Sequence, residues 1–410
     1  MSSLPVWATH LLLESGPVVA WAYAIGVWFM YSMAHECTWS AKLSSLAVRT
    51  SALVVALACS IGLCQADKAT MTRVLPLAAL FTTVSVVFCR WTRVHDVVGV
   101  SDAPFYGPQH LKQKNILITG ANSGIGKETA IQLASMGATV YLLCRSTARA
   151  QEAVDDILKH HAASIQPSQL HVVPIDLGDF ASIRQALDTL KNVQIHVLIN
   201  NAGLMMGTKT ISKDGLELMM QANHLGHFLL TCLLLERNQL VKDARILNLT
   251  SSTYHLASKG FDFADMMCDK TRKYTLFGQY AQTKLANILF TKELARRYPN
   301  LLVYAVHPGL VRTNVTSNMP WIMQILNDIF AWFVASMQKK PSQGAYSSVL
   351  CAAGPTPLLP PSGAYIVNCQ AQPLTKVADS PHDAKRLWTV SEELVGLGKQ
   401  PQQPQQQQQQ

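Results

Sequence analysis

The chain has 410 residues, of which 49% are hydrophobic, so one large domain with a substantial core and a further segment can form. Its formal net charge is +9, but the basic residues are scattered and form no run of the kind that binds nucleic acid, so we expect no nucleic-acid partner. The nine cysteines follow no metal-ligand or disulfide spacing, which predicts reduced thiols facing the cytosol and no metal site.

The first hundred residues contain three long apolar runs, which extend over Pro17–Ala34, Leu46–Cys64 and Val74–Cys89. Each run is about long enough to cross the hydrocarbon core of a bilayer, and none has a polar face. Buried core helices are the alternative, but the domain that follows is complete without them. The sequence therefore predicts that residues 1–110 form an α-helical membrane region, of about three spans, and a connector.

Basic residues beside these runs predict the orientation of the membrane region. With three spans, four of them would lie on the side of the following domain and two on the opposite side. They are Lys42, Arg49, Arg90 and Arg93 on one side, and Lys68 and Arg73 on the other. Because positive charge favours the cytosolic side, we expect the following domain to lie in the cytosol.

Between residues 111 and 397, short apolar runs alternate with helical patterns. Seven of these runs are predicted to be strands: Asn115–Thr119, Thr139–Cys144, His171–Ile175, Val197–Asn200, Arg245–Leu249, Leu302–His307 and Ala364–Asn368. The alternation predicts an α/β fold with a Rossmann-type, doubly wound parallel sheet of seven strands. From Gln400 the chain contains only Gln and Pro, so residues 398–410 are predicted to be a disordered tail.

The segment Thr119–Gly126, which reads Thr-Gly-Ala-Asn-Ser-Gly-Ile-Gly, joins the first predicted strand to the next helix. Glycines let the backbone approach a pyrophosphate, and a helix N-terminus offers amide donors. An ordinary glycine-rich turn is the alternative, but the strand before it and the helix after it favour a nucleotide site. The residues expected to bind the cofactor here are Gly120, Asn122, Ser123, Gly124, Ile125 and Gly126.

Tyr280 and Lys284 are spaced so that one helix presents both on the same face. An ammonium beside a phenol favours the phenolate, so this pairing predicts a lowered pKa for Tyr280. Any amphipathic helix can carry such a pair on its solvated face, and the pair gains its meaning from the motifs around it.

The spacing Gly-x-x-x-Gly-x-Gly and the motifs that follow it in order resemble the short-chain dehydrogenase/reductase family from about Leu111 to Leu397. These motifs are Asp176-Leu177, Asn200–Gly203, Tyr280–Lys284 and Pro308-Gly309. The resemblance implies that Asp176 meets the adenine amino group and that Asn200 supports the adenine pocket. It implies further cofactor contacts from Leu177, Ala202, Gly203, Tyr280, Lys284, Pro308, Gly309, Val311 and Thr313.

The resemblance also implies a catalytic set. Ser251 would hold the substrate oxygen, with Ser252 as the alternative, and Tyr280 would exchange a proton with that oxygen. Lys284 would bond the nicotinamide ribose, and Asn223 would support a proton-relay water. The nearby His224, His227 and His255 are interpreted as packing and hydrogen-bonding residues rather than catalytic ones.

The end of the second predicted strand indicates the choice of cofactor. Cys144 occupies the place of the acid that would bond the ribose hydroxyls of NAD, and Arg145 and Arg149 follow. Arginine suits a 2′-phosphate, although either side chain could simply be a surface residue. The sequence therefore favours NADP(H), and it leaves NAD(H) open.

Two features favour a lipophilic substrate. The stretch Asn318–Met337 is apolar over most of a helical wheel and fits a lid on a lipid chain or a membrane surface, while a core helix or the interface of a homodimer stays open. The long interval from Ser251 to Tyr280 resembles the retinol-dehydrogenase-like branch, which implies a retinoid, polyprenoid or sterol-like alcohol or carbonyl and the endoplasmic reticulum membrane. The alternatives are a catalytically silent nucleotide-binding membrane scaffold and a non-redox family member.

Overall fold

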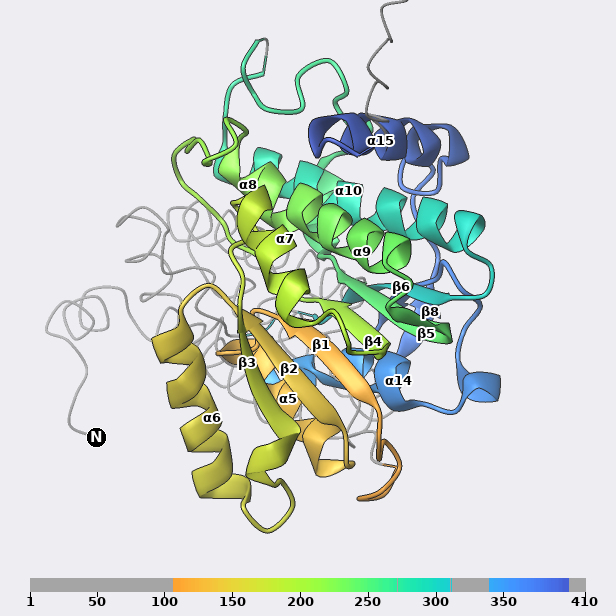
Figure 1. Ribbon diagram of the computed structural model, residues 1–410. Coiled ribbons are helices and arrows are strands. Elements are labelled where there is room, and N and C mark those ends of the chain that lie inside the picture. Colours follow the sequence, from red (N-terminus) through yellow and green to blue (C-terminus); the bar gives the residue numbers. More distant parts are fainter. Residues whose placement is uncertain (1–105, 271, 310, 312–338, 398–410) are drawn as a thin grey trace, which may run out of the picture. The chain divides into compact units, whose positions relative to one another are not determined.

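An eight-stranded sheet forms the centre of the computed structural model, which describes residues 106–270, 272–309, 311 and 339–397 (Figure 1). The strands follow the order β3-β2-β1-β4-β5-β6-β7-β8. Their bounds are β1 Asn115–Thr119, β2 Thr139–Cys144, β3 Leu170–Pro174, β4 Ile195–Asn200, β5 Leu240–Leu249, β6 Leu302–His307, β7 Tyr365–Val367 and β8 Gln370–Gln372. The first seven are parallel, so the predicted doubly wound parallel sheet of seven strands is confirmed.

The eighth strand is an addition that the sequence analysis missed. β8 pairs with β7 in the antiparallel direction through a two-residue turn, in which Asn368 and Cys369 have φ angles of 51° and 62°. Tight hairpins of this kind require positive φ at both turn residues, and Asn-Gly is their usual signal. Asn-Cys is an uncommon pair for this turn, and each strand has only three residues, so the pattern did not indicate a hairpin.

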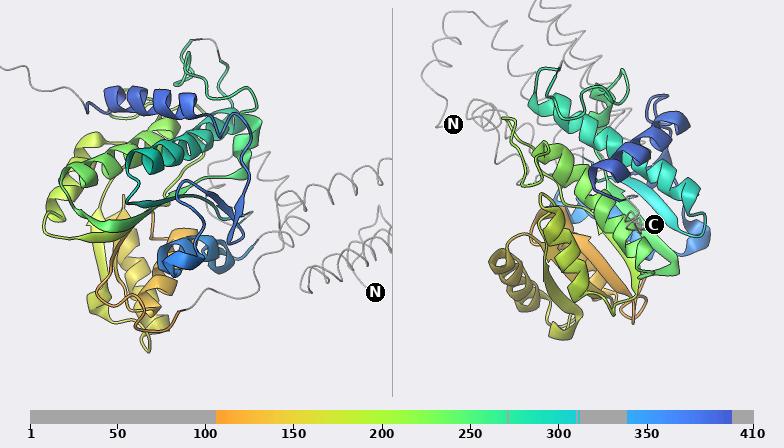
Figure 2. Two further views of the ribbon diagram at one scale, coloured as in Figure 1. Left: turned by 90° about the vertical axis from the view of Figure 1, so that its right-hand side faces the viewer. Right: turned by 45° about the horizontal axis from the view of Figure 1, so that its top comes forward.

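Helices cover both faces of the sheet and bury a separate core on each (Figures 1 and 2). On one face lie α7 Phe180–Thr189, α9 Gly226–Glu236 and α10 Leu276–Arg297, with α15 Pro381–Leu394 packed against α10. On the other face lie α5 Gly124–Ser135, α6 Thr147–His161 and α14 Tyr346–Ala353. Short helices α8 Leu218–Met220 and α13 Pro341–Gly344 precede α9 and α14.

The order of β1 and β4 positions the site. The chain leaves β1 toward β2 on one side and returns as β4 on the other, so the loops after the two strands diverge at the carboxyl edge. Nucleotides bind at such a switch point in open α/β sheets.

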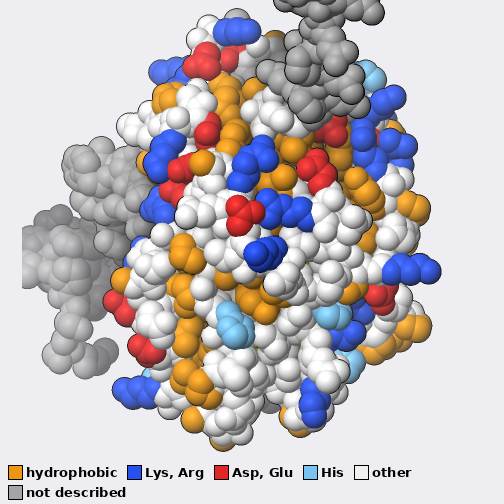
Figure 3. Space-filling view, viewed as in Figure 1, with side chains coloured by type: hydrophobic (Ala, Val, Ile, Leu, Met, Phe, Trp, Pro, Cys, Tyr) orange, Lys and Arg blue, Asp and Glu red, His pale blue; other side chains and the backbone are white. Residues whose placement is uncertain are grey.

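On the face viewed in Figure 3, Lys and Arg side chains are interspersed with acidic and hydrophobic ones.

Among the described residues, one stretch, Leu218–Glu236, is long and apolar enough to cross a membrane. It contains α9, whose residues are buried from Gly226 to Leu234, and 89% of the most apolar part of this stretch lies inside the domain. It is therefore a core helix. The three predicted membrane runs, Thr313, the apolar stretch 318–337 and the tail 398–410 lie outside the described residues.

An aromatic cluster fixes α9 against α10 and α15. The ring of Phe228 lies 5.3 Å from that of Phe290 and 5.0 Å from that of Trp388. Phe228 is fully buried, so its truncation removes transfer free energy and leaves a cavity.

We predict that Phe228→Ala lowers the free energy of unfolding by about 3–5 kcal/mol, measured by chemical denaturation of the purified protein. The control is Phe277→Ala, because Phe277 is 40% exposed and should change that free energy by no more than about 0.5 kcal/mol. Equal losses in the two variants would contradict the packing described.

Candidate active site

The glycine turn after β1 is packed tightly against the loop after β4. Gly120 and Gly124 have φ angles of 66° and 56°, which favour glycine. A Cβ added to Gly126 would lie 2.5 Å from Asn201 Nδ2 and still closer to the Gly120 carbonyl oxygen. Any larger residue at position 126 would therefore displace the turn.

Hydrogen bonds join the same two loops. The hydroxyl of Thr119 accepts from the backbone N–H groups of Asn201 and Ala202, at 2.9 Å each. Asn201 Nδ2 donates to the Thr119 carbonyl at 2.7 Å. The turn also leads into α5, where the Ser123 side chain makes no capping hydrogen bond. The close backbone approach and the first-turn amides of α5 fit the pyrophosphate of a dinucleotide.

The end of β2 lies beside this turn. Gly120 N–H donates to the Leu143 carbonyl at 2.8 Å, and Cys144 is buried against the backbone N–H groups of Ala121 and Asn122. Burial raises the pKa of the Cys144 thiol, so it stays uncharged at neutral pH. Arg145 and Arg149 follow as exposed side chains at the same edge. At the end of β2, a carboxylate would bond the ribose hydroxyls of NAD. In this chain that position is the neutral thiol of Cys144, followed by the cations Arg145 and Arg149.

Asp176 and Leu177 form the turn after β3. The Asp176 carboxylate accepts from Gly178 N–H at 2.9 Å, and this bond holds the carboxylate in the turn. Leu177 packs against the start of α9, where a Cβ added to Gly226 would lie 2.6 Å from the Leu177 carbonyl oxygen. Gly226 therefore allows α9 to approach this turn, a role that the sequence analysis did not assign.

Asn200 is buried within the sheet and supports the site from behind. Its Nδ2 donates to Asn248 Oδ1 at 2.7 Å and to Thr231 Oγ1 at 3.1 Å. These bonds connect β4 to β5 and to α9. The resemblance implies that Asn200 supports the adenine pocket, and a buried side chain bonded to its neighbours fits that role better than it fits direct contact with a ligand.

The helix α10 carries Tyr280 and Lys284 near its beginning. Tyr280 is half-buried, Lys284 is 3% exposed, and Lys284 Nζ lies 5.3 Å from the centre of the Tyr280 ring. Lys284 Nζ donates to the Leu249 carbonyl at 3.1 Å. The two side chains are thus brought together at the carboxyl end of β5.

Ser251 is held close to the same helix turn. The hydroxyl of Thr250 donates to the Lys284 carbonyl at 2.8 Å, which fixes the end of β5 on α10. Ser251 is the next residue, and its Oγ accepts from Thr253 N–H at 3.3 Å as the 3₁₀ turn Ser252–Leu256 begins. Thr250 was not predicted as a site residue, and its position directly before Ser251 is the signal that could have indicated it.

Burial affects the acid-base properties of both α10 side chains. It raises the pKa of Tyr280 above its usual range, so the expected lowering of this pKa is wrong for the structure. It lowers the pKa of Lys284 to about 8. Burial disfavours phenolate and ammonium alike, and it sets the direction of both shifts. At neutral pH the phenol keeps its proton and can donate it.

Asn223 lies in a π-helical turn, Gln221–Leu225, directly before α9. Its amide pairs with the backbone of Leu204, accepting from N–H at 2.8 Å and donating to the carbonyl at 3.0 Å. Nδ2 also lies 3.2 Å from Thr283 Oγ1 on α10. A Cβ added to Gly203 would lie 3.5 Å from Lys284 Nζ and 3.6 Å from Asn223 Oδ1, so this glycine keeps a space beside both side chains open.

The segment after β6 reaches the glycine turn. Gly309 has a φ of 88°, and a Cβ there would lie 3.0 Å from Lys339 Nζ. Val311 forms a bridge with Lys339, and both Val311 and Ile125 of the glycine turn approach Gly344. Lys339 is buried and bonds Asn368, and no sequence motif indicated it.

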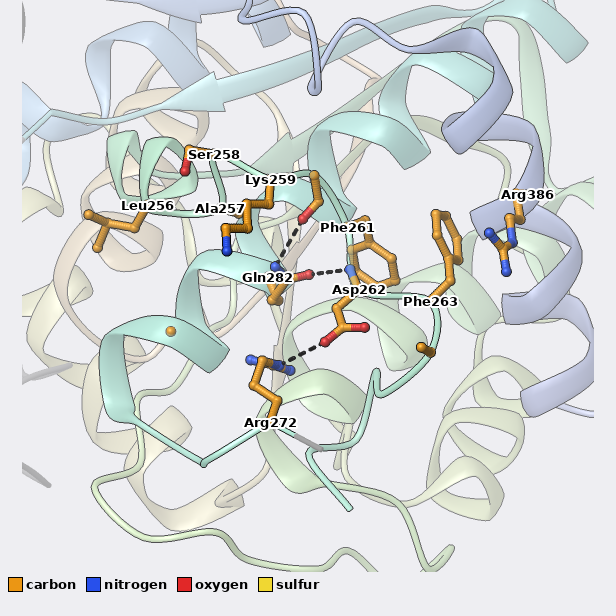
Figure 4. Close-up of a pocket in the computed structure, with 13 residues that line it drawn as sticks. Leu256, Ala257, Ser258, Lys259, Phe261, Asp262, Phe263, Arg272, Gln282 and Arg386 are labelled. Carbon is orange, nitrogen blue, oxygen red and sulfur yellow. Dashed lines mark hydrogen bonds and ion pairs between the residues drawn. The ribbon is translucent and has the colours of Figure 1, made fainter. Parts of the chain in front are cut away.

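A pocket of about 600 Å³ lies beside α10, lined mainly by the loop Leu256–Ala264 (Figure 4). Gln282 fixes this loop, since it accepts from Asp262 N–H at 2.9 Å and donates to the Gly260 carbonyl at 3.2 Å. Arg272 pairs with Asp262 at 3.2 Å, and Arg386 lies 4.2 Å from the centre of the Phe263 ring. The long interval before Tyr280 is thereby attached to the helix that carries it.

A model of the short chain dehydrogenase family matches residues 114–262. Human retinol dehydrogenase 12 is 40% identical over 291 residues, which cover 70% of this chain and 88% of the relative. The chain belongs to the short-chain dehydrogenase family. Mouse retinol dehydrogenase 14 is 36% identical over 318 residues, covering 72% of this chain and 93% of the relative.

A solved structure agrees with this assignment. An uncharacterised protein from Mycobacterium paratuberculosis has 30% identity and a TM-score of 0.55, covering 73% of this chain and 98% of that one. This short-chain dehydrogenase is thus an NAD(P)-dependent oxidoreductase of the type that acts on CH–OH groups, and the predicted retinol-dehydrogenase-like branch is confirmed. Within the described ranges, no three His, Cys, Asp or Glu side chains are grouped as they would be around a metal ion.

The low pKa of Lys284 has a consequence for stability. In the unfolded chain a lysine titrates near its usual value of 10.5, whereas in the folded protein Lys284 titrates at about 8. Between these values the unfolded state binds more protons, so the stability of the wild-type protein should rise with pH over that window. Below pH 8 the buried ammonium destabilises the fold by its full amount.

We predict that Lys284→Met raises the free energy of unfolding at pH 7 by roughly 1–3 kcal/mol without dinucleotide, and that this gain disappears as pH approaches about 10.5. The measurement is chemical denaturation across the pH range. Lys292→Met is the control, because Lys292 lies on the same helix, is partly exposed and pairs with Asp379, and its loss should change stability little. A pH-independent difference between Lys284→Met and wild type would contradict the assignment.

Proposed function

We propose that this short-chain dehydrogenase is a membrane-anchored, NADP(H)-dependent oxidoreductase that interconverts a lipophilic alcohol and its carbonyl compound. The observation that carries the proposal is the packing of Lys284 beside Tyr280 at the end of β5, where the hydroxyl of Thr250, the residue before Ser251, bonds the Lys284 carbonyl. Retinoid, polyprenoid and sterol-like compounds are the proposed substrate class. The names of the relatives, retinol dehydrogenases, support it.

The proposed mechanism assigns one task to each side chain. The hydroxyl of Ser251 donates a hydrogen bond to the substrate oxygen. NADP(H), when bound, supplies the hydride for reduction or accepts it for oxidation. During reduction the Tyr280 phenol, which burial keeps protonated, gives its proton to the oxygen as negative charge develops there. The reverse reaction returns that proton to Tyr280.

Lys284 and Asn223 would restore the phenol. With a pKa of about 8, the Lys284 ammonium can pass a proton to a neighbouring phenolate at neutral pH. It also offers donors to the ribose of the cofactor. Asn223 would support the relay water that returns a proton to Lys284, and its closeness to Gly203 and Thr283 supports this role.

The remaining cofactor contacts follow the loops at the switch point. The residues proposed to hold the pyrophosphate and its surroundings are Gly120, Asn122, Ser123, Gly124, Ile125 and Gly126. Asp176 and Leu177 would contact the adenine, and Asn200 would support that pocket from within the sheet. Ala202, Gly203, Pro308, Gly309, Val311 and Thr313 would contact the nicotinamide half. The neutral Cys144 and the cations Arg145 and Arg149 support NADP(H) over NAD(H).

The proposal includes the predicted organisation of the chain. Residues 1–110 would hold the catalytic domain, residues 111–397, at the cytosolic face of the endoplasmic reticulum membrane, and residues 398–410 would form a tail. A homodimer stays an open part of the proposal. A catalytically silent scaffold is the second candidate, but the retention of both Tyr280 and Lys284 favours an enzyme.

We predict that the full-length protein in detergent oxidises NADPH when given a retinoid, polyprenoid or sterol carbonyl compound, followed by the absorbance of the cofactor. Tyr280→Phe should lower kcat by about 10²-fold or more, because the proton donor is lost. Tyr274→Phe is the matched control, since the Tyr274 hydroxyl bonds the Met206 carbonyl at 2.9 Å and takes no part in the mechanism.

Failure of the wild-type protein to turn over any member of that panel would overturn the proposed function. Equal kcat values for Tyr280→Phe and wild type would overturn the role of Tyr280. Turnover that is lost in Tyr280→Phe but retained in Tyr274→Phe would support the proposal.

We predict that Arg145→Ala raises the Kd of NADPH by about 10-fold or more and changes the Kd of NADH by less than about 3-fold. The reason is that only NADPH carries the 2′-phosphate. Intrinsic protein fluorescence can follow both titrations, with Arg386→Ala as an exposed-arginine control on α15. Equal weakening of the two cofactors by Arg145→Ala would refute the preference for NADP(H).

A further inference from the structure

The imidazole of His227 connects the glycine turn to the π-helical turn of Asn223. His227 is the second residue of α9 and is 2% exposed. Its Nε2 lies 2.9 Å from Thr119 Oγ1, and its Nδ1 lies 3.1 Å from the Asn223 carbonyl oxygen. One side chain thus spans two elements that the proposed function assigns to cofactor binding and to proton transfer.

The direction of these hydrogen bonds follows from the chemistry of the partners. Burial lowers the pKa of His227 to about 4, so at neutral pH its ring has one N–H and one acceptor nitrogen. A carbonyl oxygen can only accept, so Nδ1 carries the hydrogen and donates it to Asn223. Nε2 must then accept, and the hydroxyl of Thr119 is its donor.

Thr119 has no hydrogen-bonding capacity left for other partners in this arrangement. Its oxygen accepts from the N–H groups of Asn201 and Ala202, and its single hydrogen goes to His227. The other acceptor within reach, the Ile199 carbonyl, is more distant at 3.4 Å. The loops that fit the pyrophosphate are therefore bonded, through one imidazole, to the peptide of Asn223.

Asn223 in turn contacts the catalytic helix. Its side chain bonds the backbone of Leu204 and lies 3.2 Å from Thr283, the residue before Lys284. Any rotation of the Asn223 peptide would move this side chain relative to Lys284. A donor fixed on the carbonyl opposes that rotation, and π-helical turns, which depart from regular α-helix geometry, are frequent at functional sites.

We propose that His227 is a positioning residue of this enzyme: its Nδ1–H fixes the Asn223 peptide for proton transfer, and its Nε2 fixes Thr119 and so the dinucleotide turn. The inference rests on the proposed function, because it assigns the effect of Nδ1 to turnover. It makes specific the interpretation of His227 as a packing and hydrogen-bonding residue.

His224 shows why burial alone does not give this role. It is also fully buried and neutral, since burial lowers its pKa to about 3. Its Nε2 instead lies 3.0 Å from Ser391 Oγ on α15, and its ring packs near Phe228 and Phe290. His224 is therefore a matched control from the adjacent turn of the same helical segment.

The test separates the two nitrogens of His227. His227→Asn keeps the bond to the Asn223 carbonyl, because the amide nitrogen of asparagine can take the place of Nδ1, and it loses the bond to Thr119. His227→Gln keeps the bond to Thr119, because the amide group of glutamine can take the place of Nε2, and it loses the bond to Asn223. His227→Gln should lower kcat by about 10-fold and leave the Kd of NADPH within about 3-fold of wild type. His227→Asn should raise the Kd of NADPH by about 3- to 10-fold and leave kcat within about 3-fold.

The Kd values come from fluorescence titration, which needs no turnover, and kcat from the full-length protein in detergent. His224→Asn and His224→Gln should shift thermal unfolding without this split between kcat and Kd. Wild-type kcat and Kd in both His227 variants, or equal changes of both quantities in both variants, would overturn the inference. A wild-type protein that binds NADPH but turns over no substrate would overturn the proposed function instead.

A double-mutant cycle tests the bridge between His227 and Thr119 through the Kd of NADPH alone. Thr119→Ser keeps the hydroxyl and should bind NADPH as wild type does, whereas Thr119→Val should weaken binding. In the Thr119→Val background, His227→Asn should cause no further rise in Kd, because the bond it removes is already absent. Additive effects of Thr119→Val and His227→Asn on Kd would contradict the bridge.

Discussion

The hydroxyl of Thr119 is the point on which the arrangement of the site depends. It lies at the end of β1, where the chain diverges toward β2 and β4, and it bonds three groups at once: two backbone amides of the loop after β4 and the imidazole of His227. Without it, the loop that includes Gly203 would lose two of the hydrogen bonds that attach it to the end of β1. The absence of side chains at Gly126 and Gly226 then lets α5 and α9 approach these loops.

Burial gives this site its chemistry and also destabilises it. The apolar surroundings that keep the Tyr280 phenol protonated disfavour the Lys284 ammonium, and the Leu249 carbonyl offsets only part of that penalty. Catalytic groups are commonly held in environments that shift their pKa values and reduce stability. In this domain the two large cores on either face of the sheet provide the stability that such a site requires.

Local pattern was sufficient for the sheet, because parallel strands buried on both faces are continuous apolar runs and the helices between them are long. The sequence did not predict β8, because the turn before it has an unusual residue pair, Asn368 and Cys369. The bond of Asn368 to Lys339, a tertiary contact, explains that turn. Site residues could be proposed from the sequence where a motif is contiguous, as at Thr119–Gly126. The partners of Lys284, Asn223 and His227 lie as many as 108 residues away in the chain, and the pKa of Tyr280 depends on burial, which spacing does not encode.

The buried helix α9 has a consequence for how this chain is made. The segment Leu218–Glu236 meets the length and apolarity requirements of a membrane span, and it follows an N-terminal region predicted to enter the bilayer. During synthesis the insertion machinery would meet it before β5, α10 and α15 have formed to cover it. Asn223, His224, His227 and Thr231 all lie within it, and such groups make transfer into lipid costly. The side chains that build the polar interior of the site thus also favour folding of this helix in water over its insertion as an additional span.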